Sequence, residues 1–153
     1  MALPKLDVPS YEIELPISKQ KIRFRPFLVK EQRNLLMAME ANDAKTIQQS
    51  IRDILNNCTL TENIDIDSLP LVDIEYYFLN LRGRSVGEVV ESKYRCNNEV
   101  NDKECGNIME TTINVLEIGV TFNENKNNLI KIDDKIAIQL QYPSFNSISM
   151  AAK

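Results

Sequence analysis

One stretch of the sequence, from Ser68 to Cys105, constrains the fold more than any other. It opens with a predicted helix that Asp67 or Ser68 caps and that has Pro70 in its first turn, where a missing N–H costs nothing. The core-facing residues of this helix are Leu71, Ile74, Phe78 and Leu81, with Tyr77 beside them. An alternating strand and a polar loop follow, so the stretch joins a helical half of the chain to a β-rich half.

The first half of the chain predicts a β-hairpin and two helices ahead of this stretch. Residues 11–15 and 22–24 alternate between apolar and charged side chains on either side of a turn. A helix then starts near Leu28, and its apolar face comprises Leu28, Leu35, Leu36 and Met39. Asn42 and Asp43 break this helix and cap the next one. The second helix has an apolar stripe along one face, formed by Ile47, Ile51, Ile54, Leu55 and Cys58. Because Cys58 lies on that stripe, it is predicted to be a small buried apolar residue.

The second half of the chain predicts strands. Gly83 and Gly87 mark the exit of the third helix, and alternation between apolar and polar residues begins soon after. The predicted strands cover residues 89–96, 109–115, 118–122, 129–132 and 136–142. Residues 133–135 form a hairpin turn between the last two strands. The order of hairpin, three helices and antiparallel strands predicts the α+β fold class.

The domain organisation follows from these elements. Residues 1–10 are expected to form an extended arm, and residues 11–142 a single α+β domain. That domain comprises a hairpin-plus-helix part, 11–87, and a β-rich part, 88–142. Residues 143–153 predict the start of a C-terminal helix, which is shorter than an independent helix needs, so we expect the native protein to continue beyond it.

Composition argues against several classes of function. The chain has no histidine, which removes the usual general base and the commonest metal ligand. A net charge of −4 without a long basic block argues against binding of nucleic acid or a membrane surface. No apolar run is long enough to span a membrane. Carboxylate pairs such as Asp73 and Glu75 suit structural positions, here the start of a helix. We therefore expect no enzymatic activity and no cofactor.

Two cysteines that flank the polar loop are the first candidate site. Cys96 ends one strand and Cys105 precedes the next, a pattern similar to a zinc ribbon. A structural zinc site needs four ligands, however, and each side of this loop offers one thiolate. A disulfide or close thiol pair across the hairpin is a second alternative, and reduced cysteines at the base of a loop are the third, which we favour.

A basic strand near the N-terminus is the second candidate site. Lys21, Arg23 and Arg25 alternate with apolar residues and would share one face of a strand. One interpretation is a solvated face paired with Glu12 and Glu14 across the hairpin. The other is a partner-binding surface.

Several segments together resemble one family. They read KIRFRPFLVKEQRNLLMAME, IQQSIRDILNNCT, DIDSLPLVDIEYYFLNLRGRSVGE, YRC with CGNIMETTINV, and IAIQLQYPSF. In this order they resemble the baseplate hub subunits and hub-assembly proteins of T-even-like contractile-tailed bacteriophages. The resemblance covers roughly residues 10–145.

The resemblance implies a non-enzymatic hub component or hub-assembly factor that is made late in infection. It would bind other phage baseplate and tail hub proteins in the host bacterial cytoplasm, and as a hub component it would remain in the baseplate of the virion tail. Another copy of the chain is a further candidate partner, in a homo-oligomer, whereas nucleic acid and membrane are not expected partners. One alternative is an assembly chaperone absent from the mature virion, and another is a zinc-stabilised nucleic-acid-binding or regulatory module.

Overall fold

A computed structural model describes residues 8–100, 103–122, 128–133, 135–144 and 147 of the chain. Most of the extended arm expected over residues 1–10 lies outside these ranges, as does most of the C-terminal helix expected over 143–153.

The described residues form an α+β fold, and the predicted class and order of elements are confirmed. A hairpin comes first, in β1 (Tyr11–Glu14) and β2 (Lys21–Phe24). The helices are α1 (Val29–Glu40), α2 (Ala44–Cys58) and α3 (Leu71–Val86), with a 3-10 turn η1 (Ile66–Ser68) before α3. The remaining elements are β3 (Val89–Arg95), β4 (Glu99–Val100), β5 (Lys103–Glu104), β6 (Ile108–Asn114), η2 (Val115–Glu117), β7 (Leu129–Lys131) and β8 (Ala137–Gln139). Each strand pair is antiparallel.

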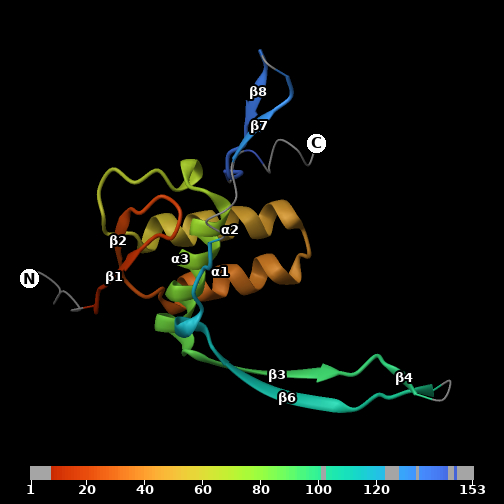
Figure 1. Ribbon diagram of the computed structural model, residues 1–153. Helices are drawn as coiled ribbons and strands as arrows, with labels where there is room; N and C mark the ends of the chain where they lie inside the picture. Colours follow the sequence, from red (N-terminus) through yellow and green to blue (C-terminus); the bar gives the residue numbers. More distant parts are fainter. Residues whose placement is uncertain (1–7, 101–102, 123–127, 134, 145–146, 148–153) are drawn as a thin grey trace, which may run out of the picture.

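The hydrophobic core lies between the first hairpin and the helices α2 and α3. In Figure 1, α1 and α2 run side by side and α3 crosses them. The buried core cluster comprises Leu15, Ile22, Phe24, Phe27, Ile54, Leu55, Cys58, Ile66, Leu69, Ile74, Tyr77 and Leu81. Most of the core residues that lie on helices come from the predicted apolar stripes of α2 and α3. The core therefore belongs to the first half of the chain.

An aromatic pair joins the hairpin to α3 in this core. The rings of Phe24 and Tyr77 meet edge to face with centroids 5.3 Å apart, and the Tyr77 hydroxyl is 2.9 Å from Thr59 Oγ1. Burial raises the pKa of the Tyr77 phenol and raises that of the Cys58 thiol to about 11. Cys58 is fully buried, as the helical stripe predicts, and it is a neutral thiol at pH 7.

The predicted apolar face of α1 is only partly correct. Leu35 packs against the core and Ala38 is buried, but Leu28, Leu36 and Met39 are each more than half exposed. The reason is that α1 lies on the outside of the body and packs chiefly on α2, so only a narrow strip of its surface is covered.

The start of α3 differs from the predicted cap. The helix begins at Leu71 after Pro70, whose side chain makes no capping hydrogen bond. Asp67 instead forms an ion pair with Arg52 on α2, with Nε and Oδ1 2.7 Å apart. The exposed N–H at the helix start is satisfied from far along the chain, because Leu71 N donates to Pro143 O at 2.9 Å.

Asp73 in the first turn of α3 has a larger role than a helix-start charge. Its side chain is fully buried, and its two carboxylate oxygens accept hydrogen bonds from Ile17 N at 2.7 Å and Ser18 N at 2.8 Å. Those two N–H groups belong to the turn between β1 and β2. The carboxylate therefore fastens the hairpin turn to the start of α3.

Gly83 does not mark the exit of α3 but lies inside it, and Gly87, with φ of 138°, ends the helix. A Cβ on Gly83 would lie 2.8 Å from Leu116 Cδ2 and 2.9 Å from Val115 Cγ2. The absence of a side chain thus lets η2 pack closely on α3. The strand predicted over 118–122 does not form, because these residues have no strand partner in the described chain. Ile118 and Phe122 are exposed there.

The β-rich half projects from the body as two hairpins. Figure 1 shows the long pair β3–β6, prolonged by β4–β5, leaving one end of the helical body and β7–β8 leaving the opposite end. The predicted turn between β7 and β8 is confirmed, since Asp133 Oδ1 accepts hydrogen bonds from Lys135 N and Ile136 N. Within the described ranges, no helix is long and apolar enough to cross a bilayer.

Candidate partner-binding surfaces

The long hairpin of β3 and β6, residues 89–114, has two chemically different faces, and we call it the arm. Cross-strand partners in an antiparallel pair point to the same side. One side, which we call the neutral face, comprises the pairs Val90 with Ile113, Ser92 with Thr111, and Tyr94 with Met109. The other side, which we call the charged face, carries Glu91, Lys93, Arg95 and Glu110. Lys93 Nζ and Glu110 Oε1 form an exposed ion pair at 2.6 Å.

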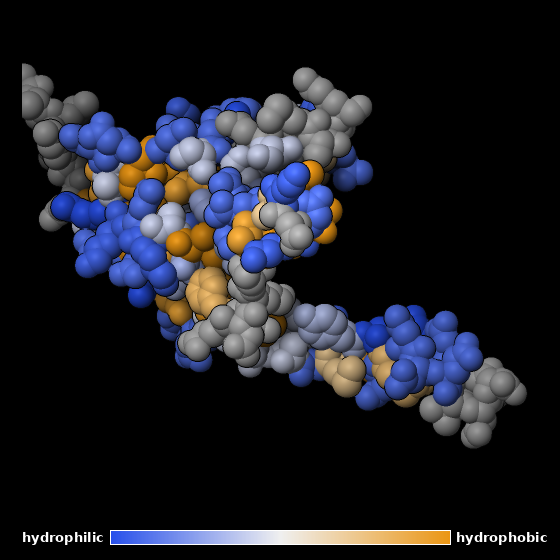
Figure 2. All heavy atoms as spheres, turned by 45° about the horizontal axis from the view of Figure 1, so that its top comes forward, coloured by the Kyte–Doolittle hydropathy of each residue, from blue (hydrophilic) through white to orange (hydrophobic). Residues whose placement is uncertain are grey.

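The neutral face of the arm is not covered by the rest of the described chain. Tyr94 and Met109 are 53% and 52% exposed, and Ile113 is 38% exposed. Figure 2 shows the arm as a narrow projection standing clear of the body. In the described ranges neither β3 nor β6 has a second neighbouring strand, so their outer backbone groups are also open to another chain.

The base of the arm is closed by hydrogen bonds and packs on α3 through η2. Val115 N donates to Glu88 O at 2.8 Å, and the Asn114 side chain accepts a hydrogen bond from Leu116 N at 3.1 Å. The turn η2 that follows packs into the space left at Gly83. The packing of η2 on α3 therefore attaches the base of the arm to the body.

Cys96 lies between β3 and β4, and Cys105 lies between β5 and β6, beyond the paired part of β3 and β6. Cys96 N donates to Asn107 O at 2.8 Å and Gly106 N to Cys96 O at 3.1 Å, while Gly106 has φ of 62°. This is the pattern of a glycine β-bulge, and it explains why glycine follows Cys105. Both cysteines are free thiols, Cys96 half-buried and Cys105 exposed. The part of the chain that the structure describes holds no cluster of three or more potential metal ligands, and two thiolates supply half of a structural zinc site.

The three basic residues Lys21, Arg23 and Arg25 do not share one face in the structure. Lys21 and Arg23 are exposed on β2, opposite Glu14 and Glu12 of β1, in the predicted register. Arg25 follows the end of β2 and turns toward the helices. Lys21 and Arg23 share an exposed face, and Arg25 is not part of it.

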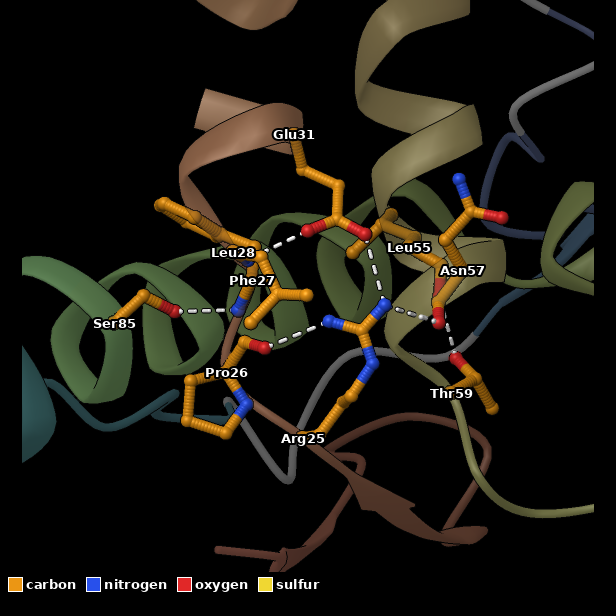
Figure 3. A network of polar contacts seen from close by, with 9 residues as sticks. All are labelled: Arg25, Pro26, Phe27, Leu28, Glu31, Leu55, Asn57, Thr59 and Ser85. Carbon is orange, nitrogen blue, oxygen red and sulfur yellow. Dashed lines mark hydrogen bonds and ion pairs between the residues drawn. The ribbon is translucent and has the colours of Figure 1, made fainter. Parts of the chain in front are cut away.

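Arg25 forms a polar junction between the hairpin, α1 and α2 (Figure 3). Its Nη2 lies 2.8 Å from Glu31 Oε1 and donates to Asn57 O at 3.1 Å, while its Nη1 donates to Pro26 O at 2.9 Å. The hydrogen bond to Glu31 raises the pKa of Arg25. Burial alone would raise the pKa of Glu31, but hydrogen bonds from Arg25 and from Leu28 N outweigh burial and lower it.

This junction predicts an acid-sensitive contribution to stability. Because the pKa of Glu31 is lower in the folded chain than in the unfolded chain, its contribution is present above the unfolded value and is lost as pH falls through the folded value. Glu31→Gln should therefore lower the free energy of unfolding by about 1 kcal/mol at pH 7. Urea unfolding at neutral pH and at about pH 3 measures this difference, which should shrink in acid.

Glu40→Gln, at the exposed end of α1, is the matched control and should change little at either pH. A difference between Glu31→Gln and the unaltered chain that stays constant from neutral pH into acid would contradict the role assigned to Glu31.

A body that holds two open β-hairpins away from its core is typical of proteins that bind other proteins. Among models of protein families, the one described as T4 bacteriophage base plate protein matches residues 8–153. The match spans nearly the whole sequence, and the chain belongs to this family. No curated protein and no solved structure matches the chain.

Family membership gives the chain a structural role in the tail baseplate of a bacteriophage, with other baseplate proteins as its partners. The resemblance noted from the sequence is confirmed at this level. Of the surfaces described above, the neutral face of the arm was not predicted from the sequence, although the alternation of Val90, Ser92 and Tyr94 places all three on one side.

Proposed function

We propose that this chain is a non-enzymatic component or assembly factor of the baseplate hub and that it acts through protein–protein contacts. The single observation that carries the proposal is the neutral face of the arm, which is rooted in the body and left exposed. Tyrosine and methionine are enriched at protein interfaces, and Tyr94 and Met109 lie opposite each other in this face.

The positions of the perturbed groups support a non-enzymatic role. Cys58 and Tyr77, whose pKa values burial raises, lie inside the hydrophobic core, where a substrate has no access. The pKa shifts of these two groups therefore have a structural cause, and the hydrogen bond of Tyr77 to Thr59 fits the same interpretation. The shifted pKa values of Arg25 and Glu31 arise from their contact with each other, which joins the hairpin to the helices.

The occupant that we assign to the neutral face is another protein of the baseplate. That protein would cover the apolar residues of the face or add a strand to an open edge of the arm. Lys21 and Arg23 form a second candidate contact, for an acidic partner surface. Charge reversal at both positions with unchanged partner binding would remove this second contact without affecting the first.

The experiment that tests the hub proposal is quantitative peptide mass spectrometry on purified phage particles beside the infected-cell lysate. A fixed ratio of peptides such as SVGEVVESK to tail proteins in the particles is expected for a hub component. Abundant peptides in the lysate and none in particles would indicate an assembly chaperone that acts in the host bacterial cytoplasm. Particles and lysate that both lack the peptides would contradict the proposal.

A further inference from the structure

The hairpin of β7 and β8 carries an apolar surface that is separate from the arm. Ile130 pairs with Ile138, Ile132 N donates to Ile136 O, and Leu140 N donates to Asn128 O. Alternation along both strands then places five aliphatic side chains on one side, which we call the aliphatic face: Ile130, Ile132, Ile136, Ile138 and Leu140. Leu129, Lys131, Ala137 and Gln139 lie on the opposite side, which therefore mixes apolar and polar residues.

Each residue of the aliphatic face is between 48% and 61% exposed, so the face is not packed against the body. The base of the hairpin is nevertheless attached to it. Leu71 N donates to Pro143 O at 2.9 Å, and Ser144 forms a β-bridge with Pro70 at the start of α3. These contacts attach the base of the hairpin, and Figure 1 shows β7 and β8 projecting from the body beyond it.

A two-stranded hairpin of this kind is marginally stable in water unless its apolar face is packed against something. A contiguous patch of isoleucine and leucine on a chain of otherwise ordinary composition marks a contact surface. The chemistry of the face decides which partner is expected.

We infer that a second copy of this chain covers the aliphatic face, with the two hairpins packed face to face about a two-fold axis. Homodimer interfaces are more apolar than non-obligate contacts between different proteins, and obligate interfaces resemble a hydrophobic core divided in two. The aliphatic face has this apolar composition. It also carries no charge, so a two-fold axis brings no like charges together.

The available area is sufficient for such a dimer. Tyr142 continues the alternation of Ile138 and Leu140 and is 56% exposed. With on the order of 100 Å² for each of these six half-exposed side chains, one copy offers roughly 600 Å². Two copies together then bury roughly 1,200 Å², which is within the range of specific interfaces.

The centre of the face is the pair of Ile130 and Ile138, because the other paired positions lie toward the turn and toward the base. A charge at Ile138 would therefore be placed at the middle of the interface, opposite its own copy. Gln139 is the next residue on the same strand and points to the opposite side. Ile138→Glu and Gln139→Glu thus introduce the same charge on the two faces of one hairpin.

The test is sedimentation velocity of the purified chain over a range of concentrations, which needs no phage and is independent of the proposed hub function. The unaltered chain should form dimers with a dissociation constant in the micromolar range. Ile138→Glu should weaken this association at least about 100-fold, while Gln139→Glu should change it less than about threefold. A chain that stays monomeric at all concentrations, or equal loss in both variants, would overturn the inference.

Hydrogen exchange of the unaltered chain provides a second measurement that does not depend on the folding of a variant. The amides of β7 and β8 should gain protection as concentration rises, while those of the arm should not. Protection of β7 and β8 that is independent of concentration would also overturn the inference.

Discussion

Replacing Asp73 with alanine is expected to lower the free energy of unfolding by about 3 kcal/mol. The Asp73 carboxylate is fully buried and accepts hydrogen bonds from Ile17 N and Ser18 N. Its removal leaves both N–H groups without an acceptor and detaches the β1–β2 turn from α3. Since β1 and β2 supply several residues of the core, the effect should spread beyond the turn.

Two further variants isolate this effect. Glu75→Ala removes an exposed carboxylate from the same helix and should cost less than about 0.5 kcal/mol. Asp73→Asn keeps the shape and one acceptor oxygen, so its loss should lie between those of the two alanine variants. Urea unfolding measures all three. Equal free energies of unfolding for Asp73→Ala and Glu75→Ala would contradict the claim that Asp73 holds the β1–β2 turn against α3.

Making the neutral face of the arm charged is expected to weaken its binding to the partner protein at least about 100-fold and thereby to leave few assembled tails. The double variant Tyr94→Lys, Met109→Glu places opposite charges at positions that face each other across the strands. Such a pair preserves the hairpin, because opposite charges attract across a ladder. The face nevertheless becomes too costly to bury against an apolar partner surface.

The charged face of the arm supplies the matched control. Lys93→Glu with Glu110→Lys exchanges the partners of the existing ion pair and leaves the neutral face unaltered. This variant should assemble tails at nearly the normal level. Because both double variants carry one positive and one negative charge at paired positions, they differ mainly in the face that is changed.

The sequence predicts the local elements of this fold well. The α2 stripe that ends at Cys58 is buried, and Glu12 and Glu14 face Arg23 and Lys21 in the expected register. These features are set by the period of apolar residues and by turn residues, both of which are local. The three helices and the hairpin order follow from the same signals.

Features that depend on distant segments were not predictable in this way. Asp73 binds a turn more than fifty residues earlier, and Gly83 is required by the later turn η2. The alternation of Arg25 with Arg23 suggested one basic face, but the strand ends at Phe24 and Arg25 turns toward Glu31. The sequence does offer one signal for Asp73. It precedes Tyr77 by four residues, which places both side chains on the same, core-facing side of the helix.

The isolation of the β-hairpins was also not predictable from their own residues. Alternation in the arm and in β7–β8 indicates one apolar side in each, and such a side is normally buried on the core. The structure leaves both apolar sides open. The core of this chain does not use residues such as Tyr94 and Ile138, and we therefore assign them to the proposed partner contacts.

The most direct test of the account is to count assembled tails by electron microscopy in cells infected with phage that encode either arm variant. We expect few tails with Tyr94→Lys, Met109→Glu and nearly normal numbers with Lys93→Glu, Glu110→Lys. Both variants should unfold in urea as the unaltered chain does, because the core lies in the body. Normal tail numbers with the altered neutral face would contradict the claim that this surface works in baseplate assembly.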